Sequence, residues 1–380
     1  MSAPPLSLLD RKLLLVTGKG GVGKSTVASA LAWLGAAAGK RVLACELDAK
    51  GDLLASLQGA GSGRSSQALT FEPRQLQKDL WAMAMDPEES LKEYLRLNLR
   101  IPFVTRIGAL STAFDFLANA APGVREIVTI GKVAYEVRER HYDLVVVDAT
   151  ATGHIIGQLR APQAINELVG VGMIRGQTAW MLDILNDPAR TGLVITTTAE
   201  EMPVNESIEL IEMVRAQTGV DIAAIIANRV LPELFTVAGE KVFEKLRMPL
   251  GMARVSEAVG DPAVASALLE GATLATDLRR TRAEHLHRLM DFVGGMTTAI
   301  VPQLFDVEPG IDTTRAVAQH LAEELNLCPR TSRRPSNRSR RRSRASTSSS
   351  AAAQAGSARP RLPPLSARSP PGARLGACSC

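Results

Sequence analysis

Cysteine is scarce in this chain of 380 residues, and its four cysteines (Cys45, Cys328, Cys378 and Cys380) form no C-x-x-C pair. A disulfide framework and a cysteine-rich metal site are therefore both unexpected. The sequence also lacks an uninterrupted run of about 18 apolar residues, which a membrane-spanning helix would need. The first eleven residues lack the basic segment and long apolar stretch of a signal peptide. We expect a cytoplasmic protein, with Cys45 as a reduced core residue.

Excess positive charge is confined to the C-terminal end. The chain has 44 basic and 39 acidic residues, but residues 331–380 hold eleven arginines and no acid, which leaves 33 basic against 39 acidic residues in 1–330. This mildly acidic balance gives no support for nucleic-acid binding, so no nucleic-acid partner is expected for the folded part. Residues 331–380 are rich in Arg, Ser and Pro and contain few large apolar groups, which predicts a disordered tail after a folded domain of residues 1–330.

Apolar runs alternate with helical patterns along the folded part. Continuous apolar segments predict buried strands at 41–47, 142–148, 192–198 and 221–228, in addition to the run at 13–16. Helices are expected between them, for example over 27–38 and 203–218. This alternation predicts an α/β fold with a doubly wound, mostly parallel sheet. Residues of about 86–140 are mostly helical in pattern and predict a helical insertion, whereas the glycines of 50–70 predict a loop.

A glycine-rich segment lies between the first predicted strand and helix. It reads Gly18, Lys19, Gly20, Gly21, Val22, Gly23, Lys24, Ser25 and Thr26. Strand, glycine loop and helix in this order are typical of a phosphate-binding loop, in which backbone N–H groups and the helix N-terminus face phosphate oxygens. Lys24 can reach the β- and γ-phosphates, and Ser25 can ligate Mg²⁺. The segment therefore predicts ATP and Mg²⁺ as cofactors.

Two aspartates follow predicted parallel strands, whose carboxyl ends form the ligand-binding edge of such sheets. Asp148 ends the most apolar strand and is placed to hold the Mg²⁺ shell through water. Asp48 ends the second strand and could accept or orient the proton of an attacking water. For both there is a plain structural alternative: a helix N-cap for Asp148 and a turn residue for Asp48.

These motifs resemble the arsenite-pump and tail-anchored-protein-targeting ATPase family, whose members are SIMIBI-class P-loop ATPases with a deviant Walker loop. The loop of that family reads GKGGVGKS/T, and its switch DTAPTGHT is similar to the segment from Asp148 to His154. The likeness covers about residues 11–327, and implies a P-loop ATPase domain that hydrolyses ATP at a dimer interface. It also implies that Lys19 reaches the partner's nucleotide and that Asp48 is the catalytic base, beside the catalytic Lys24.

The same resemblance assigns further residues. Asp148, Thr152, Gly153 and His154 would form a switch that responds to loss of the γ-phosphate. Asn228 matches the position that hydrogen-bonds adenine, and Pro302 falls in the late loop that covers the base.

At several positions this sequence departs from the family pattern, and these departures limit which activities of the family can be expected. Asp48-Ala49-Lys50 replaces D-P-A, Ala151 replaces the switch proline, and the cysteines of both the arsenite site and the zinc clamp are missing. Arsenite stimulation and tail-anchored targeting are therefore not implied. The sequence is similar to the single-domain anion-transporting ATPases of actinobacteria, which tend to occur as paired paralogues. A homodimer or a heterodimer with a paralogue is expected.

Three functional hypotheses remain open from the sequence. The first is a Mg²⁺-dependent ATPase whose dimer opens and closes for a client or membrane partner, in anion transport or protein targeting. The second is a partitioning or septum-site ATPase with the same loop, which would need a basic surface or a C-terminal amphipathic helix. The third is a nucleotide-binding scaffold with little turnover that pairs with an active paralogue.

Overall fold

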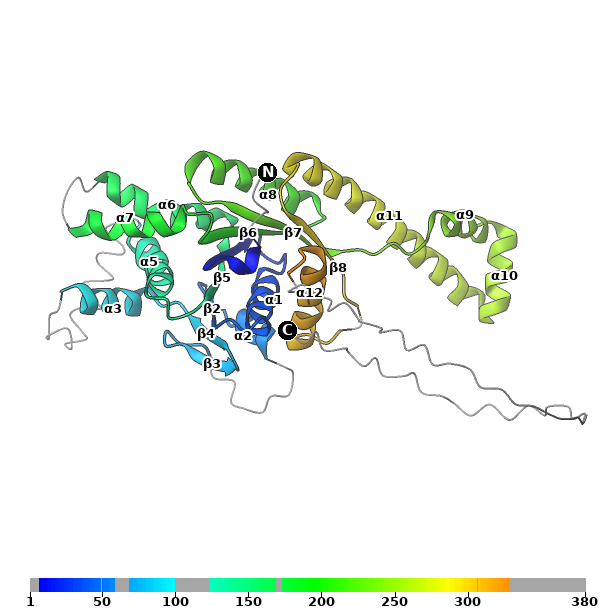
Figure 1. Cartoon of the computed structure of the whole chain (residues 1–380). Helices are drawn as coiled ribbons and strands as arrows, with labels where there is room; N and C mark the ends of the chain where they lie inside the picture. Colours follow the sequence, from blue (N-terminus) through cyan, green and yellow to red (C-terminus); the bar gives the residue numbers. More distant parts are fainter. Residues whose placement is uncertain are drawn as a thin grey trace, which may run out of the picture. The chain divides into compact units, whose positions relative to one another are not determined.

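A single sheet organises the chain. The structure, a computed structural model, describes residues 7–48, 50–58, 68–99, 123–168, 173–305 and 307–327. In this part of the chain, eight strands form one sheet in the order β3-β4-β2-β5-β1-β6-β7-β8, parallel except for the β3–β4 pair (Figure 1). The strands are β1 (Leu13–Gly18), β2 (Val42–Glu46), β3 (Arg74–Gln77), β4 (Leu80–Ala84), β5 (Leu144–Ala151), β6 (Thr191–Thr198), β7 (Ile222–Val230) and β8 (Thr298–Pro302). The α/β fold with a mostly parallel sheet is confirmed.

Helices cover both faces of the sheet. One face carries α1 (Lys24–Ala37), α2 (Asp52–Leu57) and α12 (Ile311–Glu324), beside the short 3-10 helix Leu8–Asp10. The other face carries α5 (Val124–Glu139), α6 (Thr152–Leu168), α7 (Met173–Leu185), α8 (Glu201–Gln217) and the C-terminal end of α11 (Pro262–Val293). The helix α3 (Pro87–Leu99) lies against α5. Because both faces are covered, the central strands β1, β5 and β6 are buried along almost their whole length and are mainly apolar.

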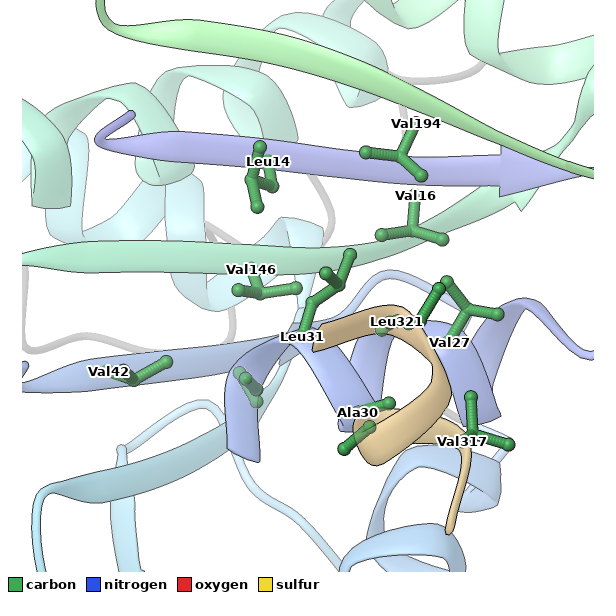
Figure 2. Packing of buried hydrophobic residues seen from close by; sticks show 14 of the residues in the cluster. Leu14, Val16, Val27, Ala30, Leu31, Val42, Val146, Val194, Val317 and Leu321 are labelled. Atoms are coloured by element: carbon green, nitrogen blue, oxygen red, sulfur yellow. The ribbon is translucent and has the colours of Figure 1, made fainter. Parts of the chain in front are cut away.

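The helix α1 lies close to the sheet. Figure 2 shows Val27 and Leu31 of α1 among side chains of the sheet and of α12, including Val16, Val146 and Leu321. A Cβ added at Gly35 would lie 2.8 Å from the Leu144 side chain and 2.9 Å from that of Val42, so a larger residue here would displace them. Tight packing of α1 fixes the position of the loop that precedes it.

One segment differs from the sequence-based expectations. The predicted loop over 50–70 is wrong for Asp52–Leu57, which form α2. Glu46 at the end of β2 accepts hydrogen bonds from the backbone N–H groups of Asp52 and Leu53, and this distant cap stabilises a helix of only six residues. Residues 59–67, 100–122 and 331–380, which include parts of the predicted loop and helical insertion and the whole predicted tail, lie outside the described residues.

The helices α9 (Val237–Leu246) and α10 (Pro249–Val259) precede the 32-residue helix α11. The C-terminal end of α11 is joined to α8 by an ion pair between Arg282 and Glu200 (2.7 Å) and a hydrogen bond from Arg288 to Asn205 (2.5 Å). Ten large apolar side chains between residues 234 and 278 are exposed in this segment. Among the described residues, no helix combines the length and apolar composition needed to cross a bilayer.

Candidate active site

The glycine loop joins β1 to α1 in the conformation that its glycines permit. Gly21 (φ +87°) and Gly23 (φ +93°) have left-handed backbones, and Gly23 is the N-cap of α1. At Gly18, a Cβ would lie 2.0 Å from the Thr196 carbonyl oxygen of β6. The loop is therefore shaped by glycine at both of its ends, as predicted from the strand–loop–helix pattern.

A cavity of about 910 Å³ opens beside this loop. Its volume is at the upper end of the range typical of small-ligand sites. Predicted site residues meet there from three segments: Gly20, Gly21, Gly23, Lys24, Ser25 and Thr26 from the loop and α1, Asn228 from β7, and Pro302 from β8. Its other lining comes from α2 with the flanking Lys50 and Gln58, from Arg229, from α12, and from the segment before α12, namely Gln303, Leu304, Val307, Pro309 and Gly310. The carboxyl ends of strands thus form the cavity, where parallel sheets bind ligands.

Asp148 does not line this cavity, but it is buried on the strand next to β1 and lies close to Lys24 and Ser25 of α1. Its register partners are Val16 of β1 and Glu46 of β2. The side chain is 6% exposed, and its Oδ1 has no hydrogen-bond partner. Burial raises the pKa of Asp148 to about 6, while Ser25 and Lys24 act in the opposite direction. A buried carboxylate oxygen without a partner, beside a serine hydroxyl, fits the oxygen-rich surroundings that Mg²⁺ prefers.

Glu46 is a buried carboxylate that the sequence reasoning missed. It is 2% exposed, and its Oε1 caps α2 whereas its Oε2 has no partner. Because Glu46 pairs with Asp148 across β2 and β5, both carboxylates face the same side of the sheet. The available signal was an acidic residue that ends the apolar run Val42–Glu46. The unpaired oxygens of Glu46 and Asp148 lie on neighbouring strands.

Lys24 extends from the first residue of α1 toward the loop. Its Nζ donates to the Lys19 carbonyl oxygen at 3.3 Å. Burial lowers the pKa of the Lys24 ammonium, and the neighbouring Asp148 carboxylate opposes that effect. The cation is therefore held beside the loop by a backbone oxygen and a carboxylate.

Asp48 does not line the cavity either; it lies in an exposed turn after β2, next to Leu47, whose backbone N–H donates to the Asp148 carbonyl oxygen at 3.1 Å. The Oδ2 of Asp48 is 3.2 Å from the Nζ of Lys50, a residue that lines the cavity. The Asp48 hydrogen bond raises the pKa of the Lys50 ammonium. One carboxylate oxygen of Asp48 is therefore paired with Lys50.

The end of β7 holds the loop from one side. The Asn228 side-chain amide donates to the Val22 carbonyl oxygen at 2.9 Å, and Arg229 donates to the Gly21 carbonyl oxygen at 3.1 Å. Asn228 is 3% exposed, and a Cβ on Gly23 would lie 2.4 Å from its Nδ2. Asn228 thus reaches the cavity while its amide nitrogen binds the loop. Its hydrogen bond to adenine stays a prediction.

The other side of the loop meets α8 through a residue that the sequence did not reveal. Glu206 places Oε1 2.5 Å from the Lys19 Nζ, and its Oε2 accepts from the Thr152 hydroxyl at 3.3 Å. Lys19 and Thr152 do not line the cavity, and neither do Gly153 and His154, which are exposed in the first turn of α6. Glu206 is 187 residues from Lys19 in the chain, so no local pattern pointed to it.

Comparison with known proteins agrees with this geometry. The family model for anion-transporting ATPases, the ArsA ATPase family, matches residues 11–182 and 174–247. The chain belongs to this family. It is therefore an ATP-hydrolysing enzyme with a nucleotide-binding site, and the predicted family resemblance is confirmed.

Individual ATPases are similar over much of this ArsA-family chain. The ATPase BagA of Mycobacterium tuberculosis is 32% identical over 239 residues, which cover 60% of this chain and 68% of BagA. The ATPase get3 of Schizosaccharomyces japonicus is 29% identical over 210 residues, or 53% of this chain and 60% of the relative. The ATPase ARSA1 of Chlamydomonas reinhardtii is 25% identical over 281 residues, which cover 58% and 35% of the two chains.

Proposed function

We propose that this ATPase hydrolyses Mg²⁺·ATP in the cavity beside the glycine loop. The observation that carries the proposal is the position of Lys24 and Ser25 between the loop and the buried, unpaired Oδ1 of Asp148. The loop N–H groups and the N-terminus of α1 would bind the phosphates, with Lys24 at the β- and γ-phosphates. Asn228, Pro302 and the adjoining residue Gln303 would enclose the base, since they line the same cavity.

Mg²⁺ would be held by the Ser25 hydroxyl and, through water, by Asp148, as the unpaired carboxylate oxygen supports. When bound, the ion would neutralise charge that develops on the phosphate oxygens. Glu46 adds a second unpaired oxygen beside Asp148. Its other oxygen caps α2, so Glu46 would also connect this edge of the site to the turn that carries Asp48.

Asp48 would act as the general base that accepts a proton from the attacking water. Its exposed turn at the carboxyl edge of the sheet supports this role. Because one of its oxygens is paired with Lys50, that contact would have to open or turn before Asp48 meets a water beside the γ-phosphate.

Hydrolysis would take place at the interface of a dimer, either of two copies or of this chain with a paralogue. Lys19 supports this proposal, because it is a second lysine in the loop that does not line its own chain's cavity. Closing and opening of that dimer would act on a client or membrane partner. The family description, anion transport, makes a transport partner the first to test, ahead of protein targeting.

The test is nucleotide binding and single-turnover hydrolysis with Asp48→Asn. We expect ATP affinity within about threefold of the wild type and a loss of turnover of about 100-fold or more, the range for a general base. The matched control is Asp10→Asn. Asp10 is an exposed aspartate that precedes the N-terminal end of β1, away from the glycine loop, so this variant should leave ATP affinity and turnover unchanged. Unchanged turnover in Asp48→Asn would remove the assigned base. Wild-type protein that binds ATP without turning it over in the presence of Mg²⁺ would favour the scaffold hypothesis.

A further inference from the structure

We propose that Glu206 is a positioning residue that holds Lys19 within its own chain and ties it to the segment after β5. This inference rests on the proposed role of Lys19 at a dimer interface, and it names the contact that must break before Lys19 can reach a second copy. The partner that competes for Lys19 is then the anionic nucleotide bound by that copy.

The two oxygens of Glu206 bind two different parts of the site. Oε1 takes the Lys19 ammonium at 2.5 Å, and Oε2 takes the Thr152 hydroxyl at 3.3 Å. Lys19 belongs to the phosphate loop, and Thr152 is the first residue of α6, directly after the strand that carries Asp148. One carboxylate therefore joins the loop to the predicted switch.

The helix that presents Glu206 is packed against the sheet. Around Glu206, Pro203, Val204, Ser207 and Leu210 are buried between α8 and the sheet, and the Ser207 hydroxyl donates to the Pro203 carbonyl oxygen. The carboxylate therefore projects from a fixed helix and holds Lys19 and Thr152 at defined positions.

The contact is also accessible enough to break. The side chains of Lys19 and Glu206 are 30% and 29% exposed, so water can replace each partner without leaving a buried charge unpaired. A fully buried pair would lock the lysine, because separating it would strand a charge away from water. This half-exposed pair can be exchanged for the phosphates of a neighbouring nucleotide, which offer more negative charge to the same ammonium.

The first experiment measures the contact without nucleotide. Full-length protein is treated with an amine-acetylating reagent, and the rate of Lys19 labelling is followed by mass spectrometry with the other lysines as internal references. We expect labelling of Lys19 to be about fivefold to tenfold faster in Glu206→Gln, because the reagent needs an unpaired amine. Glu209→Gln, an exposed glutamate on the same helix, is the matched control and should change it less than twofold. A wild-type labelling rate in Glu206→Gln would overturn the proposal.

A second variant separates the two oxygens. Glutamine keeps an oxygen that can accept from Thr152, whereas Glu206→Ala removes both contacts. Hydrogen exchange in the first turn of α6 should therefore be at least about threefold faster in Glu206→Ala and nearly unchanged in Glu206→Gln. Equal exchange in the wild type and both variants would show that Glu206 does not tie Lys19 to the switch.

The third readout is assembly, by sedimentation velocity with Mg²⁺ and a non-hydrolysable ATP analogue. Release of Lys19 should lower the concentration of half-dimerisation about fivefold to tenfold in Glu206→Gln. Unchanged or weaker dimerisation despite faster Lys19 labelling would overturn the competition between Glu206 and the partner. If no dimer forms in the wild type or in any variant, the dimer proposal itself fails. The labelling and exchange rates would then still decide the contact within one chain.

Discussion

The two sides of the phosphate loop are held by contacts of different kinds. At β7, the buried Asn228 amide donates to the Val22 carbonyl oxygen, and glycine at position 23 makes room for it. At α8, a half-exposed carboxylate holds the ammonium of Lys19. A neutral buried hydrogen bond has no solvent to replace it, whereas a half-exposed ion pair does. We therefore expect the Asn228 contact on the β7 side of the loop to stay intact, and the Glu206 contact of Lys19 on the α8 side to exchange with other partners.

Lys24 lies between the two sides, and its removal should have the largest effect. In Lys24→Ala we expect turnover to fall about 100-fold to 1000-fold, because a cation directed at the phosphates is lost from a partly dry site. Both loop contacts are made by other residues, so the thermal transition of the nucleotide-free protein should stay cooperative. Steady-state ATPase assays with circular dichroism melting check this, and turnover above a tenth of the wild-type rate would contradict it.

Asp148→Asn should stabilise the nucleotide-free protein while it impairs Mg²⁺-dependent turnover. The folded-state pKa of about 6 lies above the ordinary value of 3.8, so the ionised form is the one that folding disfavours. The contribution of Asp148 to the free energy of unfolding is fully present below about pH 4 and is lost as the pH rises through about 6. At neutral pH the loss is about 2 to 3 kcal/mol. Asp148→Asn should therefore raise the free energy of unfolding at pH 7.5 and leave it unchanged at pH 4. Equal stability of the two proteins at both pH values would argue against a buried carboxylate with an unpaired oxygen.

Asn228→Ala tests the β7 side of the loop. It leaves the buried Val22 carbonyl oxygen without a partner, which should cost about 2 kcal/mol of unfolding free energy and weaken ATP binding about tenfold. The matched variant is Arg229→Ala, in which an exposed side chain loses its bond to Gly21. Denaturant melts and nucleotide titrations should show a change below about 0.5 kcal/mol for Arg229→Ala. An equal loss of unfolding free energy in the two variants would show that the buried Asn228 contact stabilises the loop no more than the exposed Arg229 contact.

The smallest effect is expected from deletion of residues 331–380. Their composition provides almost no large apolar groups to pack on the domain, so turnover should stay within about twofold of the full chain. The measurement is ATPase activity with and without the segment. A marked loss would mean that these arginine-rich residues contribute to the site or to assembly.

The sequence predicted those parts of the molecule that depend on local pattern. The apolar runs located the central strands, and the glycine loop located the cavity. The prediction failed at α2, since its helical state depends on a cap from Glu46 rather than on its own residues. Glu206 was missed because its contacts join residues far apart in the chain.

The junction between α8 and α11 has a mechanical consequence. Glu200 and Asn205 bind Arg282 and Arg288, so the helix that presents Glu206 is fastened to one end of α11. At 1.5 Å per residue, the stretch from Pro262 to Leu286 is a lever arm of about 36 Å. A tilt of α11 by about 5° at its contact with α8 would move its N-terminal end by about 3 Å. A small displacement of α8 near Lys19 would therefore produce a larger displacement at α10.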